Sequence, residues 1–105
     1  MKAQLKVRIG FGLGTRSGMK TPTDLGELAE ILERLKFDSL WFSERVAGSS
    51  LDPLVLMSWI AGRTEKLKFG PSIMVLPGRN PVILAKSLAS LDVISEGRLL
   101  PAFGL

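Results

Sequence analysis

The sequence predicts an α/β fold built from parallel strands, and three observations carry this prediction. An apolar run rich in β-branched residues, Phe69 to Leu76, is followed by a helical pattern and then, after Gly97, by a second apolar run, Leu99 to Leu105. This order is typical of a strand, a crossover helix and a parallel strand. Neither run alternates apolar with polar residues, which indicates strands that are buried on both faces. The third observation is a repeat at intervals of about thirty residues, the length of a βα unit.

The repeat is marked by three helix starts of the same kind, a capping residue followed by proline: Thr21-Pro22, Asp52-Pro53 and Asn80-Pro81. The capping side chain accepts a hydrogen bond from a free backbone N–H of the first turn, and proline has no N–H to satisfy there. A strand candidate precedes each helix start, and a fourth follows the last helix. The predicted strands are Leu5 to Leu13, Ser39 to Ser43, Leu67 to Leu76 and Leu99 to Phe103. The pattern is therefore (βα)3β.

The predicted helices differ in how much of their surface is apolar. The first, about Pro22 to Lys36, has one apolar and one charged face, and Asp24 can form a capping box with Thr21. The helix at Leu54 to Ala61 and the helix that follows Asn80-Pro81 are apolar nearly all round. Two interpretations of these helices remain open, additional core or the interface of a homodimer. The interface interpretation uses the apolar residues Leu54, Met57, Ile60, Leu84, Leu88 and Leu91.

Gly70-Pro71 interrupts the third predicted strand. Proline cannot donate a hydrogen bond to a strand ladder, and glycine has no side chain to pack. We therefore expect a β-bulge or a break in the ladder near Ser72.

Length and composition limit what this unit can be. The chain has 105 residues and is 46% hydrophobic, whereas a complete α/β barrel typically needs about 250 residues, so residues 1–105 are expected to form a single partial domain. Cysteine and histidine are absent, which excludes disulfides, thiol nucleophiles and imidazole bases. No metal site is expected. The net charge of +4 is not gathered in a basic run, and no apolar segment has the length of a membrane span. These features predict a soluble, cytoplasmic protein that binds neither nucleic acid nor a membrane.

Polar residues follow the predicted strands at the edge where parallel α/β folds bind ligands. Ser43, Glu44 and Arg45 follow the second strand, and they form either part of a site or a salt-bridged surface loop. Arg16, Arg45 and Arg79 lie in the loops after three successive strands, beside three helix N-termini. This arrangement predicts an electropositive face suited to a phosphate or carboxylate, although solvated loop arginines are also common.

Gly10, Gly12 and Gly14 do not complete a dinucleotide-binding fingerprint, because Thr15 stands where the third glycine is required. We expect these glycines to let the backbone approach a ligand or a neighbouring strand. The large aromatic residues are expected in the core rather than against a cofactor: Trp41, Phe42 and Trp59.

Three segments resemble the luciferase-like monooxygenase family, in its branch of flavin- or deazaflavin (F420)-dependent oxidoreductases: FDSLWFSERV, DPLVLMSWIAGRTEKLKFGPSIMVLPGRNP and LASLDVISEGRLLPAFGL. The resemblance implies a TIM (β/α)8 barrel, of which this chain holds the N-terminal (βα)3β half. It implies F420 or FMN at the carboxyl ends of the strands and hydride transfer between this cofactor and a small organic substrate. It also implies a cis peptide bond at Ser72-Ile73 that backs the cofactor ring.

The site residues expected from this resemblance are Gly12, Ser43, Ser72, Ile73 and Met74 for cofactor binding, with Glu44 and Arg45 for catalysis. Many deazaflavin-dependent relatives have an acidic residue followed by histidine after the second strand, whereas this chain has Glu44-Arg45. The chain lacks the later βα units of the family, so we expect it to be inactive by itself. The alternative is a non-catalytic half-barrel that acts only as an oligomerising module. In either case the exposed strand edges predict a homo-oligomer.

Overall fold

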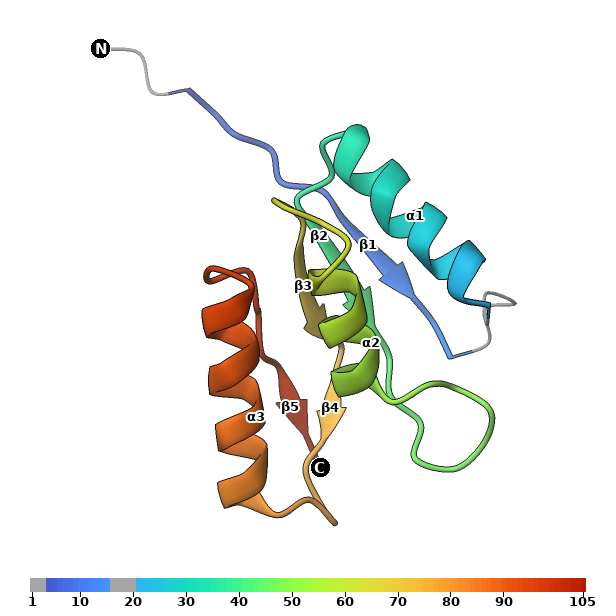
Figure 1. Cartoon of the computed structure of the whole chain (residues 1–105), viewed down its shortest axis with the longest axis vertical. Coiled ribbons are helices and arrows are strands. Elements are labelled where there is room, and N and C mark those ends of the chain that lie inside the picture. Colours follow the sequence, from blue (N-terminus) through green and yellow to red (C-terminus); the bar gives the residue numbers. More distant parts are fainter. Residues whose placement is uncertain (1–3, 16–20) are drawn as a thin grey trace.

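The structure is a computed structural model and describes residues 4–15 and 21–105. Parallel strands alternate with helices along the chain (Figure 1). The strands are β1 (Gly10–Leu13), β2 (Ser39–Phe42), β3 (Lys68–Pro71), β4 (Met74–Val75) and β5 (Phe103–Gly104), and the helices are α1 (Pro22–Arg34), α2 (Pro53–Ala61) and α3 (Pro81–Ile94). The predicted α/β class is confirmed. No helix in the described ranges is long and apolar enough to cross a membrane.

All neighbouring strands are parallel. β1, β2 and β3 form one sheet in that order, and β4 pairs with β5. A bridge between Phe69 and Leu99 joins β3 to the segment that leads into β5. The final segment therefore runs beside both β3 and β4, in the place predicted for the fourth strand.

The third predicted strand is divided into β3 and β4, and the peptide bond Ser72-Ile73 between them is cis, as the resemblance implied. The register on both sides of this break shows a bulge. Phe69 and Met74 are five positions apart, while their partners Leu99 and Phe103 are only four apart. One extra residue therefore lies on this side of the pair, which defines a β-bulge. The predicted bulge is confirmed.

β1 is shorter than the predicted strand Leu5 to Leu13. Before β1, Ile9 is hydrogen-bonded to the neighbouring segment: its N–H donates to the Asp38 carboxylate and its C=O accepts from the Asp38 N–H, both at 2.8 Å. Leu5 and Val7 are 93% and 70% exposed. The described residues place only β2 beside β1, so nothing extends the sheet over residues 4–8 and buries these apolar side chains.

All three predicted helix starts are confirmed. Each capping side chain accepts a hydrogen bond from a backbone N–H in the first turn of its helix, which satisfies a donor that has no partner within the helix. The pairs are Thr21 with Asp24 (3.1 Å), Asp52 with Val55 (3.1 Å) and Asn80 with Val82 (3.0 Å).

The core lies between the strands and the helices, and in Figure 1 α1 and α2 lie along the three-stranded sheet while α3 lies beside β5. Phe42 is buried in this core, as predicted. Trp41 is only half-buried and lies across the opposite face of the sheet. Its indole fits between two glycines, because an added Cβ would be 3.0 Å from its Nε1 at Gly10 and 2.9 Å from its Cζ3 at Gly70. Trp59 is also half-buried, and its ring packs 4.6 Å from the Arg63 guanidinium carbon.

The residues proposed from the sequence for a dimer interface are mostly core residues. Met57, Ile60, Leu84 and Leu91 are at most 7% exposed, and Leu54 and Leu88 are half-buried. The exposed apolar side chains of α2 and α3 are different ones: Val55, Val82, Ile83, Val93 and Ile94, each at least 66% exposed. The core interpretation therefore holds for one face of each helix, and an interface would use the other face.

Glu33 at the end of α1 holds the loop between α2 and β3. Its carboxylate accepts hydrogen bonds from the backbone N–H groups of Glu65, Lys66 and Leu67, at 2.8–3.0 Å. Burial alone would raise the pKa of Glu33, but these three amide donors favour the charged form and lower the pKa below its ordinary value.

The substitution Glu33→Gln is expected to lower the free energy of unfolding at pH 7 by about 1–3 kcal/mol, because a charged acceptor is lost. A carboxyl whose pKa is lower in the folded chain stabilises the fold above its unfolded pKa, about 4.3, and loses this effect as the pH falls through the folded pKa. The difference in free energy of unfolding between parent and variant, measured with urea, should therefore be smaller at pH 3 than at pH 7. Glu27→Gln on the same helix removes an equal charge and serves as the control. A parent–variant difference that is equal at both pH values would contradict this role.

Candidate functional site

The predicted site residues gather where the carboxyl ends of the strands meet. Gly12 lies in β1, Ser43 directly follows β2, and Ser72 and Ile73 lie between β3 and β4. Because β1, β2 and β3 are parallel and adjacent, these residues share one edge of the sheet.

This edge of the sheet is built mostly from small residues. An added Cβ would meet nothing within 4 Å at Gly12 or Gly14. Ser43 is half-buried and Ser72 is exposed. Ile73 is 46% exposed and lies over Gly104, where an added Cβ would fall 1.8 Å from Ile73 Cδ1. Open backbone, two hydroxyls and one apolar side chain therefore form a platform that a planar ring can approach closely.

Met74 does not take part in this platform. Its side chain is fully buried in the core, and its N–H donates to the C=O of Ala102 at 2.9 Å. Among the five residues predicted to bind the cofactor, Met74 is thus the one whose side chain packs on the opposite side of the strand. The cofactor-binding role of all five residues stays a prediction.

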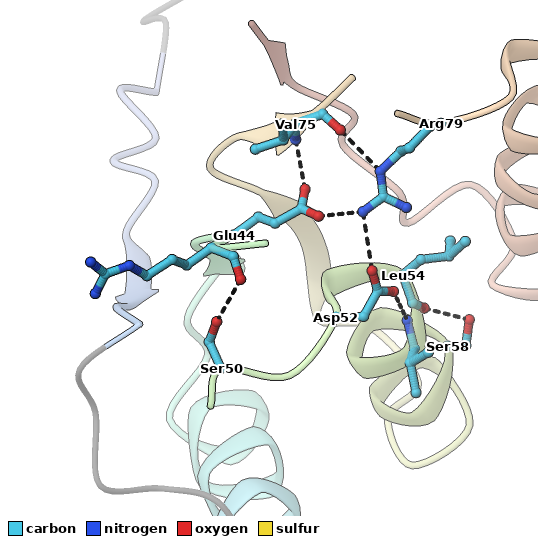
Figure 2. A network of polar contacts seen from close by, with 9 residues as sticks. Glu44, Ser50, Asp52, Leu54, Ser58, Val75 and Arg79 are labelled. Carbon is cyan, nitrogen blue, oxygen red and sulfur yellow. Dashed lines mark hydrogen bonds and ion pairs between the residues drawn. The ribbon is translucent and has the colours of Figure 1, made fainter. Parts of the chain in front are cut away.

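Glu44 belongs to a polar network beside the platform (Figure 2). One carboxylate oxygen accepts the N–H of Val75 at 2.6 Å, and the other forms an ion pair with Arg79. Arg79 Nε donates to the C=O of Val75 at 3.0 Å, and Nη2 also pairs with Asp52 at 3.0 Å. The side chains of Glu44, Arg79 and Asp52 are 7%, 21% and 42% exposed, so the network is buried at Glu44 and open at Asp52.

The network changes the electrostatics expected at this edge. Burial would lower the pKa of Arg79, but hydrogen bonds to Asp52 and Glu44 outweigh it and raise the pKa above its ordinary value. Arg79 thus stays charged between two carboxylates and is not the free cation that an electropositive face requires. Arg16 lies outside the described residues, so among the three arginines only the exposed Arg45 remains for that role.

Glu44 and Arg45 are neighbours with different surroundings. Both carboxylate oxygens of Glu44 are engaged, whereas the described residues form no ion pair with Arg45. Ser50 Oγ donates to the Arg45 backbone C=O at 3.1 Å and fixes the loop there. A hollow of about 280 Å³ is lined by the network and by Arg45. The catalytic roles of Glu44 and Arg45 stay predictions. Of these two residues only Arg45 is exposed, so only its side chain is accessible to a ligand.

Sequence reasoning identified Asp52 as a helix cap and Arg79 as a loop cation, but it missed their contact. The available signal was opposite charges in successive loops after parallel strands, because such loops lie side by side. In the described part of the chain, no three side chains of the His, Cys, Asp and Glu types come together as metal ligands.

Comparison with known proteins extends this picture. Residues 1–104 match the luciferase-like monooxygenase family. The chain is similar to limonene 1,2-monooxygenase of Rhodococcus erythropolis, with 35% identity over 77 residues that cover 70% of this chain and 20% of that protein. It is similar to F420-dependent glucose-6-phosphate dehydrogenase of Kineococcus radiotolerans, with 29% identity over 90 residues, 79% of this chain and 27% of that protein.

A solved structure shows the same fold. The coenzyme F420 dependent tetrahydromethanopterin reductase from Methanopyrus kandleri matches with a TM-score of 0.78 and 29% identity, over 95% of this chain and 27% of that chain. The chain thus spans between 20% and 27% of the length of these three proteins. Its (βα)3β unit superposes on part of an α/β barrel.

Proposed function

Because the chain belongs to the luciferase-like monooxygenase family, we propose that it forms the strand-end platform on which an F420 or FMN ring lies in an oxidoreductase of that family. The platform of Gly12, Ser43, Ser72 and Ile73 carries this proposal. F420 is supported by the names of two similar proteins, and FMN by the resemblance to the flavin-dependent branch of the family.

The residues at the platform fit a planar tricyclic ring. The open backbone at Gly12 and the exposed Ile73 offer an accessible and partly apolar surface, on which ring atoms would make close van der Waals contact. The hydroxyls of Ser43 and Ser72 are donors and acceptors for polar atoms at the ring edge. The cofactor would supply the hydride chemistry, with a small organic molecule as its partner, and the protein would supply orientation and electrostatics.

Arg45 is the residue that we propose to contact the reacting molecules. It is exposed beside the platform and carries a permanent charge with a planar array of donors. Such a group can hold a carboxylate, a phosphate or a developing negative charge. It does not replace the missing histidine as a proton donor, because a guanidinium keeps its protons in proteins.

The second candidate function, an oligomerising module without catalysis, is favoured by the exposed apolar faces of α2 and α3. Val55, Val82, Ile83, Val93 and Ile94 are each at least 66% exposed, and burying such side chains against a second copy is favourable by about 25 cal/mol per Å². We propose that the chain forms a homodimer through these faces. The dimer is compatible with either function, since the platform lies at the strand ends.

A single preparation of the chain tests both functions. Fluorescence titration is expected to show weak saturable binding of F420 or FMN, with Kd above roughly 100 μM, and no measurable turnover, because only part of a barrel surrounds the ring. Analytical ultracentrifugation across a dilution series is expected to show a dimer. Absence of binding together with a dimer would favour the oligomerising module. Tight stoichiometric binding would contradict the view that the platform is only part of the cofactor site, and a micromolar monomer would exclude the dimer.

A further inference from the structure

The backbone of Val75 has no neighbouring strand on one side. In the β4–β5 pair, the N–H groups of the residues on either side of Val75 donate toward β5: Met74 to Ala102 at 2.9 Å and Leu76 to Gly104 at 3.0 Å. Successive residues of a strand turn their backbone groups in opposite directions. The N–H and C=O of Val75 therefore face the other side, toward β2.

On that side the strand pairing has already ended. The last ladder bond runs from the Ser72 N–H to the C=O of Phe42, at 2.7 Å, and Phe42 is the final residue of β2. β2 does not continue past Phe42, so this ladder does not extend as far as Val75. In the described part of the chain no strand is left to pair with Val75 there.

Two side chains occupy the place of the missing strand (Figure 2). Glu44 accepts the Val75 N–H at 2.6 Å, as a strand carbonyl would, and Arg79 Nε donates to the Val75 C=O at 3.0 Å, as a strand amide would. Their mutual ion pair joins the acceptor to the donor. Asp52 holds Arg79 from the far side, and its second oxygen caps α2 through the Val55 N–H at 3.1 Å.

We propose that Glu44 and Arg79 are positioning residues that replace a strand beside β4 and thereby hold the platform residues Ser72 and Ile73 in place. This inference rests on the proposed function of the platform. Neither side chain has to touch the cofactor for this role. It also assigns Glu44 a function different from that of an acid or base, since both of its oxygens are occupied.

Burial and charge favour this role over the alternatives. The ion pair of Arg63 and Glu30 on the surface leaves side chains 42% and 53% exposed, whereas Arg79 and Glu44 are 21% and 7% exposed. Two carboxylates surround one guanidinium, so the network has no excess positive charge to attract a phosphate. Exposed ion pairs contribute little to a fold, while a buried pair that also binds backbone fixes a local geometry.

Hydrogen exchange measured by NMR on the whole ¹⁵N-labelled chain tests whether the two side chains hold β4. Arg79→Met keeps the aliphatic stem and removes the donors, and we expect the Val75 amide to exchange at least tenfold faster, with the Asp24 amide at the N-terminus of α1 unchanged. Glu44→Gln, a milder change, should have a smaller effect in the same direction. Arg63→Met is the matched control and should leave Val75 unchanged. Unchanged exchange at Val75 in both network variants would overturn the proposal.

Titration of the same samples with FMN and F420, followed by amide shifts of residues 72–75, tests whether the platform depends on the network. Arg79→Met is expected to raise Kd at least fivefold relative to the parent and to Arg63→Met. Faster exchange at Val75 with an unchanged Kd would show a purely structural network and overturn the positioning role. A parent chain that binds neither cofactor would overturn the proposed function and this role with it, while the exchange rates would still decide whether Glu44 and Arg79 hold β4.

Discussion

Replacing Arg98 with methionine is expected to lower the free energy of unfolding by about 3 kcal/mol or more, or to prevent folding. Arg98 is only 8% exposed. Its guanidinium donates to the C=O groups of Ser95, Ala61 and Leu67 and to the Thr64 hydroxyl, at 2.8–3.1 Å. Methionine fills most of the same volume but leaves these buried oxygen atoms without their donor, and each such loss costs about 1–3 kcal/mol.

The position of Arg98 explains why one side chain has this effect. Two of its acceptors lie at the C-terminal ends of α2 and α3, where helical C=O groups have no partner within the helix and carry partial negative charge. The guanidinium carbon also lies 5.5 Å from the centre of the Phe69 ring, in the middle of the core. Arg98 thus joins α2, α3 and the start of β3.

Urea unfolding followed by circular dichroism measures the expected loss. Arg98→Lys should be intermediate, because an ammonium group keeps the charge but lacks the planar array of donors. Arg34→Met, at an exposed position of α1, serves as the control and should change the free energy of unfolding by no more than about 0.5 kcal/mol. A methionine variant within 1 kcal/mol of the parent would show that water or a rearranged backbone satisfies the acceptors.

Replacing Gly70 with alanine is expected to destabilise the chain by about 3 kcal/mol, the upper range for overfilling a packed site. An alanine Cβ at this position would lie 2.1 Å from the backbone oxygen of Leu100 and 2.9 Å from Cζ3 of Trp41. The first of these contacts is with backbone and cannot be relieved by a side-chain rotation. Relief requires β3 to separate from the final segment, where the Leu100 N–H donates to the Phe69 C=O at 2.8 Å.

Gly12→Ala provides the matched control for Gly70→Ala, since it makes the same change in β1 of the same three-stranded sheet. An added Cβ at Gly12 meets nothing within 4 Å, and alanine has less conformational entropy to lose on folding than glycine. Gly12→Ala should therefore be neutral or slightly stabilising. Thermal unfolding of both variants separates the two cases, and equal melting temperatures would contradict the close approach at Gly70.

Local signals in the sequence were sufficient for much of the fold. Helix starts depend on residues within a few positions of each other, so Thr21, Asp52 and Asn80 could be identified as caps directly. The irregularity of the third strand could also be predicted, because Gly70 and Pro71 restrict their own backbone. The length of β1 could not be predicted, since apolar composition does not reveal that residues 4–8 have no sheet to bury them.

The tertiary structure alone decided which polar groups meet. Glu44 and Arg79 are 35 residues apart, and Arg98 and Ala61 are 37 apart, so no local periodicity links them. The tertiary structure also decided that the Met74 side chain faces the core, because the bulge changes which side each later residue of the strand faces. The sequence by itself determined the order and type of the elements through local backbone preferences. The site required the folded chain, because its contacts form between loops that only the parallel sheet brings side by side.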